Sequence, residues 1–176
     1  EALLALMREL ARFEGYDETL KPLYATDLAK AGYRVVIPDQ LGFGKSSKST
    51  EYPYSFPALA TNTKSLLDAL GVEKATILGH SMGGMVAARF ALMFPGQTEK
   101  LVLVNPIGLE DWQAKGVPYR SVDEWYAREL KQNFESIKKY QLASYYDGKW
   151  DAKYDPWVEL LARVTLSPEH PRLARV

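Results

Sequence analysis

The residues of this chain that are best placed for chemistry form the segment G-H-S-M-G at residues 79–83, followed directly by Gly84. The apolar run 75–78 before the segment predicts a strand, and the apolar pattern 85–92 after it predicts a helix. A serine on so tight a strand-to-helix turn holds its hydroxyl clear of the backbone, where it can attack a substrate. This context predicts a nucleophile elbow centred on Ser81.

The neighbours of Ser81 fit this chemistry. Glycine is expected at Gly79 and Gly83 because side chains two residues to either side of the serine would collide in the turn. The helix that begins after Ser81 points free N–H groups at the same spot, so we expect the backbone N–H of Met82 to bind an oxyanion. The alternative is a glycine-rich turn with an ordinary serine, and the flanking strand and helix disfavour it.

Composition excludes several classes of function. The 176 residues suffice for one domain, or for one domain with an insertion. The 22 basic and 22 acidic side chains balance, so neither nucleic acid nor an anionic membrane is an expected partner. The sequence has no cysteine, which excludes disulfides and thiol catalysis, and two histidines are too few for a typical zinc site. We expect no cofactor and no metal.

No part of the sequence indicates a membrane or a secretory address. No apolar run approaches the length that spans a bilayer, and charged residues interrupt the apolar pattern of residues 1–13. A cytoplasmic location is the resulting expectation.

Strands and helices are expected to alternate up to Asn105, which predicts a parallel sheet with flanking helices, an α/β fold. Short apolar or β-branched runs mark the strands, and Ser55 and Gly71 mark the start and the end of one helix. The expected strands cover residues 33–37, 75–78 and 101–104, and the expected helices cover residues 1–13, 20–31, 56–70 and 82–94.

The pattern changes after Asn105. No run between Pro106 and Trp157 predicts a strand, and aromatic side chains crowd this part of the sequence. The residues S-V-D-E at 121–124 fit a capping box, which predicts a helix that starts near Trp125. We expect a mostly helical layer over residues 106–162 that covers the carboxyl ends of the strands.

Three segments together resemble the α/β-hydrolase superfamily, in its serine-nucleophile branch. Residues 33–47, Y-R-V-V-I-P-D-Q-L-G-F-G-K-S-S, are similar to that family's strand and loop of the type P-D-x-x-G-x-G-x-S. Residues 75–84 contain the elbow, and residues 100–105 are similar to the strand that leads into the family's cap. The resemblance covers about residues 20–162 and implies an α/β-hydrolase core with a helical cap segment.

The chain also departs from that family, so the resemblance implies an incomplete hydrolase. Residues 1–19 show no strand and no H-G turn of the kind that supplies the family's second oxyanion N–H. The strands that carry the family's acid and histidine are not seen after Trp157. We therefore expect an N-terminal helix outside the family pattern (1–19), a partial core with the elbow (20–105), and a helical cap segment with a tail (106–176).

The catalytic base is open between two histidines. His80 is adjacent to the nucleophile, but its side chain leaves the turn in another direction, so we expect it to be packed and hydrogen-bonded beside the elbow. His170 follows the cap, in the right order for a base. Because Pro171 follows His170, we expect an extended tail there, and a surface role for His170 is the alternative.

The acid is open as well. Glu110 and Asp111 follow the third expected strand, where some family members keep their acid, whereas Asp39 is expected to hydrogen-bond backbone in its own loop. The G-K-S at 44–46 is typical of the end of a phosphate loop. That motif needs glycine where Asp39 stands, and no helical pattern starts at Ser46, so nucleotide binding is not expected.

Two functions remain. The first is an esterase-like serine hydrolase that cleaves a small apolar ester or related acyl substrate through a Ser81 acyl-enzyme, with the aromatic cap residues lining an acyl pocket. The family's dehalogenase and epoxide-hydrolase branches use aspartate where Ser81 stands. The alternative is a truncated or rearranged, non-catalytic hydrolase core that acts as a binding or interaction module.

The partners of the chain are open between a homo-oligomer and a partner chain that completes the sheet. We expect poor catalysis by this chain unless His170 reaches Ser81.

Overall fold

The structure is a computed structural model, and it describes residues 23–175, with burial given from residue 26 onward. The chain divides after Asp39 into two compact units, and each is described by itself. The helix expected over 1–13 and the whole N-terminal segment 1–19 lie outside the described residues.

The described part of the first unit holds one helix, α2 (Leu23–Lys30). The helix ends one residue before the expected position, and Gly32, which follows with a φ of 91°, turns the chain so that the N–H of Tyr33 donates to the carbonyl oxygen of Leu28 at 3.1 Å. The strand expected over 33–37 is wrong, because the structure has no strand there. A strand needs the hydrogen-bonding edge of a neighbour, and this unit holds no other strand among its described residues.

The second unit is built on a parallel pair of strands, β1 (Ala75–His80) and β2 (Thr98–Val104). Both strands confirm the sequence expectation and extend beyond it. The register pairs Leu78 with Val102 and His80 with Val104. Parallel strands end at the same edge, so the residues that follow His80 and Val104 become neighbours.

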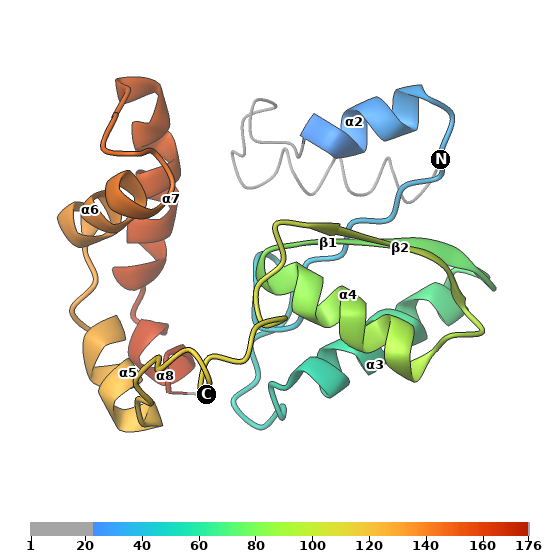
Figure 1. Cartoon of the computed structure of the whole chain (residues 1–176), viewed down its shortest axis with the longest axis horizontal. Helices are drawn as coiled ribbons and strands as arrows, with labels where there is room; N and C mark the ends of the chain where they lie inside the picture. Colours follow the sequence, from blue (N-terminus) through green and yellow to red (C-terminus); the bar gives the residue numbers. More distant parts are fainter. Residues whose placement is uncertain (1–22, 176) are drawn as a thin grey trace. The chain divides into compact units, whose positions relative to one another are not determined.

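Two helices, α3 (Phe56–Ala69) and α4 (Met82–Met93), cover the same face of this pair (Figure 1). The expected cap of α3 is confirmed, because the Ser55 side chain accepts a hydrogen bond from the N–H of Ala58 at 3.3 Å. Gly71, with a φ of 66°, follows the end of α3.

The core of this part lies between the helices and the sheet. Ala60, Leu67 and Phe90 are buried together, and β1 contributes the half-buried Ala75 and Ile77 to the same cluster. On β1 and β2, Leu78 is 48% exposed and its register partner Val102 is 39% exposed. Hydrophobic burial therefore holds one face of the strand pair against α3 and α4.

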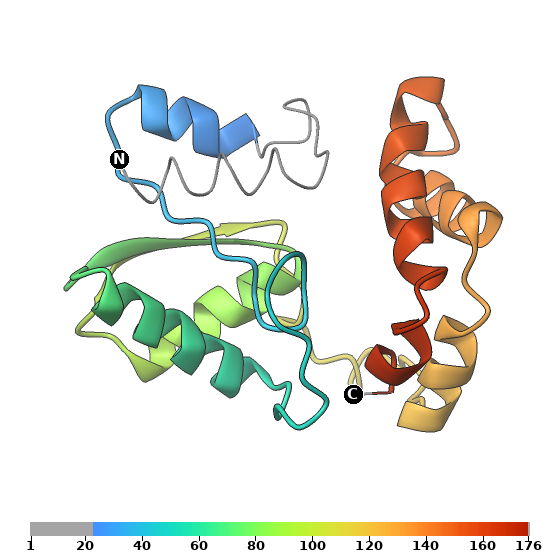
Figure 2. The ribbon, with the colours of Figure 1, turned by 180° about the vertical axis from the view of Figure 1, so that it is seen from behind.

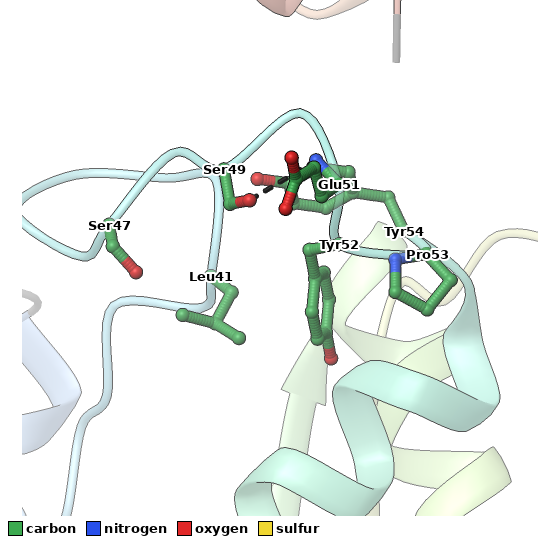
Figure 3. Close-up of a pocket in the computed structure, with 7 residues that line it drawn as sticks. All are labelled: Leu41, Ser47, Ser49, Glu51, Tyr52, Pro53 and Tyr54. Carbon is green, nitrogen blue, oxygen red and sulfur yellow. Dashed lines mark hydrogen bonds between the residues drawn. The ribbon is translucent and has the colours of Figure 1, made fainter.

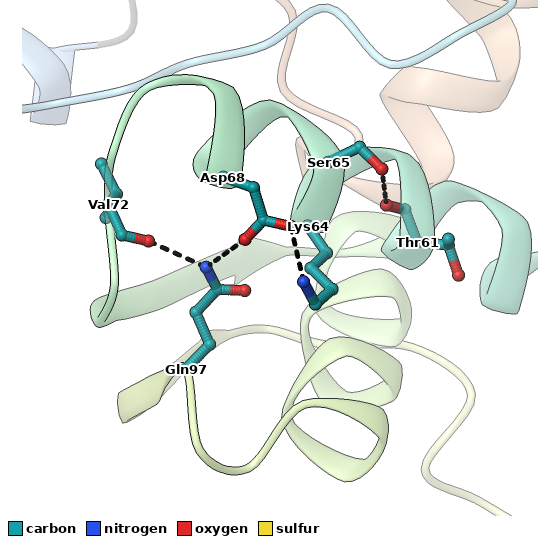
Figure 4. A network of polar contacts seen from close by, with 6 residues as sticks. All are labelled: Thr61, Lys64, Ser65, Asp68, Val72 and Gln97. Atoms are coloured by element: carbon teal, nitrogen blue, oxygen red, sulfur yellow. Dashed lines mark hydrogen bonds and ion pairs between the residues drawn. The ribbon is translucent and has the colours of Figure 1, made fainter.

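A polar network joins the end of α3 to the start of β2 (Figure 4). The Gln97 side-chain amide donates to the carbonyl oxygen of Val72 at 2.8 Å and to the Asp68 carboxylate at 3.0 Å. Lys64 pairs with the same carboxylate at 2.5 Å. The hydrogen bonds from Lys64 and then from Gln97 lower the pKa of Asp68.

The regular elements after β2 are all helices among the described residues, residues 105–121 form turns and loop, and none of the residues between 106 and 162 lies in a strand. This helical segment contains α5 (Val122–Glu129), α6 (Phe134–Ser144), the 3₁₀ helix η2 (Ala152–Tyr154), α7 (Asp155–Thr165) and α8 (His170–Leu173). Figure 2 shows the segment from behind, coloured from light orange to red. The expected capping box is present: Ser121 accepts from the N–H of Glu124 at 3.3 Å, and Glu124 accepts from the N–H of Ser121 at 2.7 Å. The position of this segment over the strand ends stays a prediction.

A second small core holds α6 and α7 together, built from the buried residues Ile137, Val158 and Ala162. Beside it, one oxygen of the Asp155 carboxylate accepts hydrogen bonds from Lys138 at 2.8 Å and from the Trp150 indole at 2.9 Å. These two donors, Lys138 first, lower the pKa of Asp155. Across residues 23–175, no helix combines the length and the apolar character that crossing a bilayer requires.

Candidate active site

Ser81 is the single residue between the end of β1 and the start of α4, as the sequence predicted. Its φ is 53° and its ψ is −121°, a conformation that costs free energy for any residue with a Cβ. The Ser81 side chain makes no capping hydrogen bond to α4. The hydroxyl is therefore held on a strained turn without the task that serine usually performs at the start of a helix.

The two glycines of the motif have different roles. A Cβ on Gly79 would lie 2.2 Å from the carbonyl oxygen of Gly83 and 2.8 Å from the Cβ of Ala87, so residue 79 must be glycine. The same expectation for Gly83 is wrong, because nothing lies within 4 Å of its Cβ position. The crowding is one-sided: β1 passes close to the backbone of α4, whereas a side chain at Gly83 would point into open space.

Sequence reasoning did not identify the need for a third glycine, Gly84. A Cβ on Gly84 would lie 2.7 Å from the Cβ of Pro106, in the segment that leaves β2. The available signal was the extra glycine directly after G-x-S-x-G. Its close contact with Pro106 brings the segment after β2 against the first turn of α4.

The backbone of Ser81 is bonded to that same segment. Its N–H donates to the carbonyl oxygen of Val104 at 3.1 Å. Its carbonyl oxygen accepts from the N–H of Gly84 at 2.9 Å and from the N–H of Ile107 at 3.3 Å. Both polar backbone groups of Ser81 are satisfied, which helps to hold its unfavourable dihedral angles.

The electrostatics at Ser81 favour negative charge. Met82 is the first residue of α4, and the N–H groups of a helix's first turn have no partner inside the helix. The 12-residue α4 places its partial positive charge at this end. Backbone N–H groups directed at a developing oxyanion lower the barrier to acyl transfer. The geometry thus supports the expected position of Met82, and its role stays a prediction.

Neither histidine lies where the sequence suggested. His80 ends β1 and is exposed, so the expectation that it is packed beside the turn is wrong. His170 begins the helix α8 and is 7% exposed, so it lies neither in an extended tail nor on the surface. Its Nε2 atom lies 3.5 Å from Oε1 of Glu129. The contact that the structure gives His170 is with α5 and not with Ser81.

The candidate acids have local partners. Glu110 pairs with Lys115 at 2.9 Å, and the Asp111 carboxylate accepts from the N–H of Ala114 at 2.9 Å. Both residues are exposed, and these contacts organise their own loop. Across the described residues, no three His, Asp or Glu side chains are grouped so that they could hold a metal ion.

The loop over residues 40–54 contains a shallow hollow of about 290 Å³ (Figure 3). Gly42, with a φ of 88°, explains one glycine of the loop motif, because a Cβ there would lie 2.6 Å from the Tyr54 ring. No helix begins at Ser46, as expected if the loop does not bind a nucleotide. The hollow is lined by Leu41, Ser47, Ser49, Glu51, Tyr52, Pro53 and Tyr54. Ser81 is not among them.

Comparison with known proteins shows one family. The family model described as the alpha/beta hydrolase fold matches residues 19–152. A 2-hydroxy-6-oxononadienedioate/2-hydroxy-6-oxononatrienedioate hydrolase of Comamonas testosteroni is 34% identical over 110 residues, which are 62% of this chain and 38% of the relative. A 2-hydroxy-6-oxo-6-phenylhexa-2,4-dienoate hydrolase of Burkholderia cepacia is 35% identical over 109 residues, with the same shares of 62% and 38%.

A solved structure of a similar protein has the same fold over most of this chain. A probable hydrolytic enzyme of Pseudomonas aeruginosa superposes with a TM-score of 0.81 at 53% identity, over 86% of this chain and 49% of that one. The chain therefore spans about half of this solved relative and less than half of the two curated ones.

Proposed function

Because this chain belongs to the alpha/beta hydrolase fold family, we propose that it is a hydrolase whose Ser81 attacks an ester or related acyl substrate. The Ser81 oxygen would add to the substrate carbonyl as a base takes the hydroxyl proton. The ester C–O bond would then break, and the alcohol would leave with that proton while the acyl group stays on Ser81. Water would then release the acid and restore the serine. The N–H of Met82 would bind the oxyanion in both steps.

The observation that carries this proposal is the position of Ser81. Ser81 lies on a strained turn between β1 and α4, its side chain makes no cap to the helix, and its backbone directly precedes the positive end of α4. A protein keeps such strain only where its surroundings hold it, and strained residues gather at functional sites.

The similar proteins favour a second class of substrate. Both curated relatives are named as hydrolases of 2-hydroxy-6-oxo compounds. For this chain, a 2-hydroxy-6-oxo dienoate is therefore the second candidate substrate beside a simple ester. Both candidates present a carbonyl carbon to Ser81, so the same nucleophile and the same oxyanion contact would serve either one. In the dienoate a carbon–carbon bond to the 6-oxo carbon would break in place of the ester C–O bond, and the carbon leaving group would take up the proton that an alkoxide takes up from an ester.

The base is a separate part of the proposal. A base must come within about 2.6–3.2 Å of the Ser81 hydroxyl, or somewhat further without substrate. His170 remains the candidate, with Glu129 as its carboxylate neighbour at 3.5 Å. We also retain the proposal that a homo-oligomer or a partner chain completes the sheet, since the chain spans a fraction of its relatives.

A fluorophosphonate probe tests the nucleophile directly, because it reacts with activated serines. We expect the probe to label the wild-type chain and not Ser81→Ala. Ser65→Ala is the matched control, since Ser65 is an exposed serine on α3 whose hydroxyl donates to the carbonyl oxygen of Thr61 at 3.1 Å. Labelling of Ser65→Ala at the wild-type rate completes the expected result.

Other outcomes would contradict the proposal. Equal labelling of wild type and Ser81→Ala would show that the probe reacts elsewhere. A folded wild-type chain that no probe labels would favour the alternative, a non-catalytic core that binds a ligand or a partner. Turnover of p-nitrophenyl acetate and of a 2-hydroxy-6-oxo dienoate by the wild-type chain then separates the two substrate classes.

A further inference from the structure

Asn105 follows β2 directly, as Ser81 follows β1. His80 and Val104 are register partners, so Ser81 and Asn105 are neighbours at the carboxyl ends of the two strands. Asn105 has a φ of 41°, in the left-handed region. Within residues 23–175, the residues other than glycine with a positive φ are Ser81, Asn105 and Asp147. Two of these three strained residues therefore lie side by side.

The turn at Asn105 explains how one short segment binds both sides of Ser81. The carbonyl oxygen of Val104, just before Asn105, accepts from the N–H of Ser81 at 3.1 Å. The N–H of Ile107, two residues after Asn105, donates to the carbonyl oxygen of Ser81 at 3.3 Å. An extended residue at position 105 would carry the chain onward along β2, and these two groups would not both face Ser81.

Pro106 adds a packing contact to the same arrangement. Its Cβ would lie 2.7 Å from a Cβ on Gly84, so it rests on bare backbone in the first turn of α4. The left-handed turn at Asn105 thus places three groups in succession: the accepting carbonyl oxygen of Val104, the packed ring of Pro106 and the donating N–H of Ile107. Together they hold Ser81 and the helix that begins beside it.

We propose that Asn105 is a positioning residue that keeps Ser81 reactive by holding this left-handed turn; the inference rests on the proposed role of Ser81 as nucleophile. Asparagine tolerates the left-handed region better than other residues with a Cβ, apart from aspartate. A β-branched residue at 105 drives φ back to negative values and withdraws Val104 or Ile107 from Ser81. Ser81 then relaxes, and its hydroxyl leaves the end of α4.

The test compares two substitutions at 105 with a matched one elsewhere. Asn105→Gly keeps the left-handed conformation, and Asn105→Val opposes it. Asp147→Val is the control, because Asp147 also has a positive φ of 49° and is exposed, with a loose pair to Lys149 at 3.8 Å. The Asp147→Val substitution therefore places a β-branched residue at a similar left-handed position, in the loop between α6 and η2.

The first measurement is the rate at which a fluorophosphonate labels Ser81. We expect Asn105→Val to be labelled about tenfold more slowly. An ordinary residue with a Cβ loses about 1–2 kcal/mol in the left-handed conformation, and a free energy of that size changes a rate about tenfold. Asn105→Gly and Asp147→Val should be labelled within a factor of about two of the wild type. Wild-type labelling of Asn105→Val, or slow labelling of Asn105→Gly, would overturn the inference.

The second measurement does not depend on reactivity. Amide hydrogen exchange of Ser81 and Ile107 should become faster in Asn105→Val and stay unchanged in Asn105→Gly and Asp147→Val. If the wild type is not labelled at all, the proposed function fails, while the exchange rates still decide whether Asn105 holds Ser81. If Asn105→Val does not fold, Asn105→Ala replaces it with the same expected direction, and unchanged exchange in that variant overturns the inference.

Discussion

The Cβ position of Gly79 lies 2.2 Å from the carbonyl oxygen of Gly83, across the turn that carries Ser81. The contact is one-sided, since the Cβ position of Gly83 has no neighbour within 4 Å. The end of β1 at Gly79 therefore lies against the backbone of α4. Backbone cannot move aside as a flexible side chain can. Two glycines that look equivalent in the motif are not equivalent in the fold.

Gly79→Ala and Gly83→Ala should consequently differ sharply in stability. We expect Gly79→Ala to lower the free energy of unfolding by about 3 kcal/mol, or to prevent folding, because its methyl group overlaps backbone. Gly83→Ala should be neutral or stabilising by up to about 1 kcal/mol, because alanine favours a helix over glycine. Urea unfolding of both variants measures the difference. Equal losses would contradict the one-sided contact.

Gln97→Ala should be more harmful than Lys64→Ala, although both side chains bind Asp68. Gln97 also satisfies the half-buried carbonyl oxygen of Val72, and loss of that hydrogen bond should cost about 1–2 kcal/mol. Lys64 makes an exposed contact within α3, and such pairs contribute little. Thermal unfolding of the two variants, side by side, checks this order. A larger loss in Lys64→Ala would show that the ion pair, and not the amide, secures the end of α3.

Asp155 should make the helical segment sensitive to acid. Its pKa is lowered in the folded chain, so its contribution to stability is full above its unfolded pKa of about 4 and is lost as the pH falls through the folded pKa. Asp155→Asn keeps an oxygen for the Trp150 indole but does not titrate. We expect its unfolding temperature to fall less than that of the wild type between pH 6 and pH 3.

The matched control for Asp155 is Asp147→Asn, which removes an exposed carboxylate with a loose partner. This control should follow the wild type over the same pH range. If Asp155→Asn also follows the wild type, the contact with Lys138 does not contribute to stability.

His170→Ala separates a structural histidine from a catalytic one. His170 is buried and contacts Glu129, so its removal should lower the free energy of unfolding by about 2 kcal/mol. Because His170 is the proposed base, we expect fluorophosphonate labelling of Ser81 to fall in this variant, measured at a temperature where the variant is folded, and Glu129→Gln would then test the role of the carboxylate neighbour. Labelling that persists in the folded variant would assign His170 a structural role alone.

The sequence alone predicted those features that depend on neighbours along the chain. The tight turn at Ser81, the cap at Ser55 and the capping box at Ser121 arise from residues within a few positions of one another, and all three are present. The same holds for β1, β2 and the helices beside them, whose apolar patterns reflect one local period. The family was also recognisable from short segments, and the match over residues 19–152 confirms it.

The remaining features were decided by contacts between distant parts of the chain. The run at 33–37 has the composition of a strand, but composition does not provide the neighbouring edge that a strand requires. Whether Gly83 or Gly84 is crowded depends on where Pro106 passes, more than twenty positions later. His170 was expected in a tail and lies against Glu129, because helix packing brings α8 back to α5. The types and spacing of residues thus determined which chemistry this chain could carry, and tertiary packing decided which side chains meet, since only the folded backbone brings distant positions within a few ångströms.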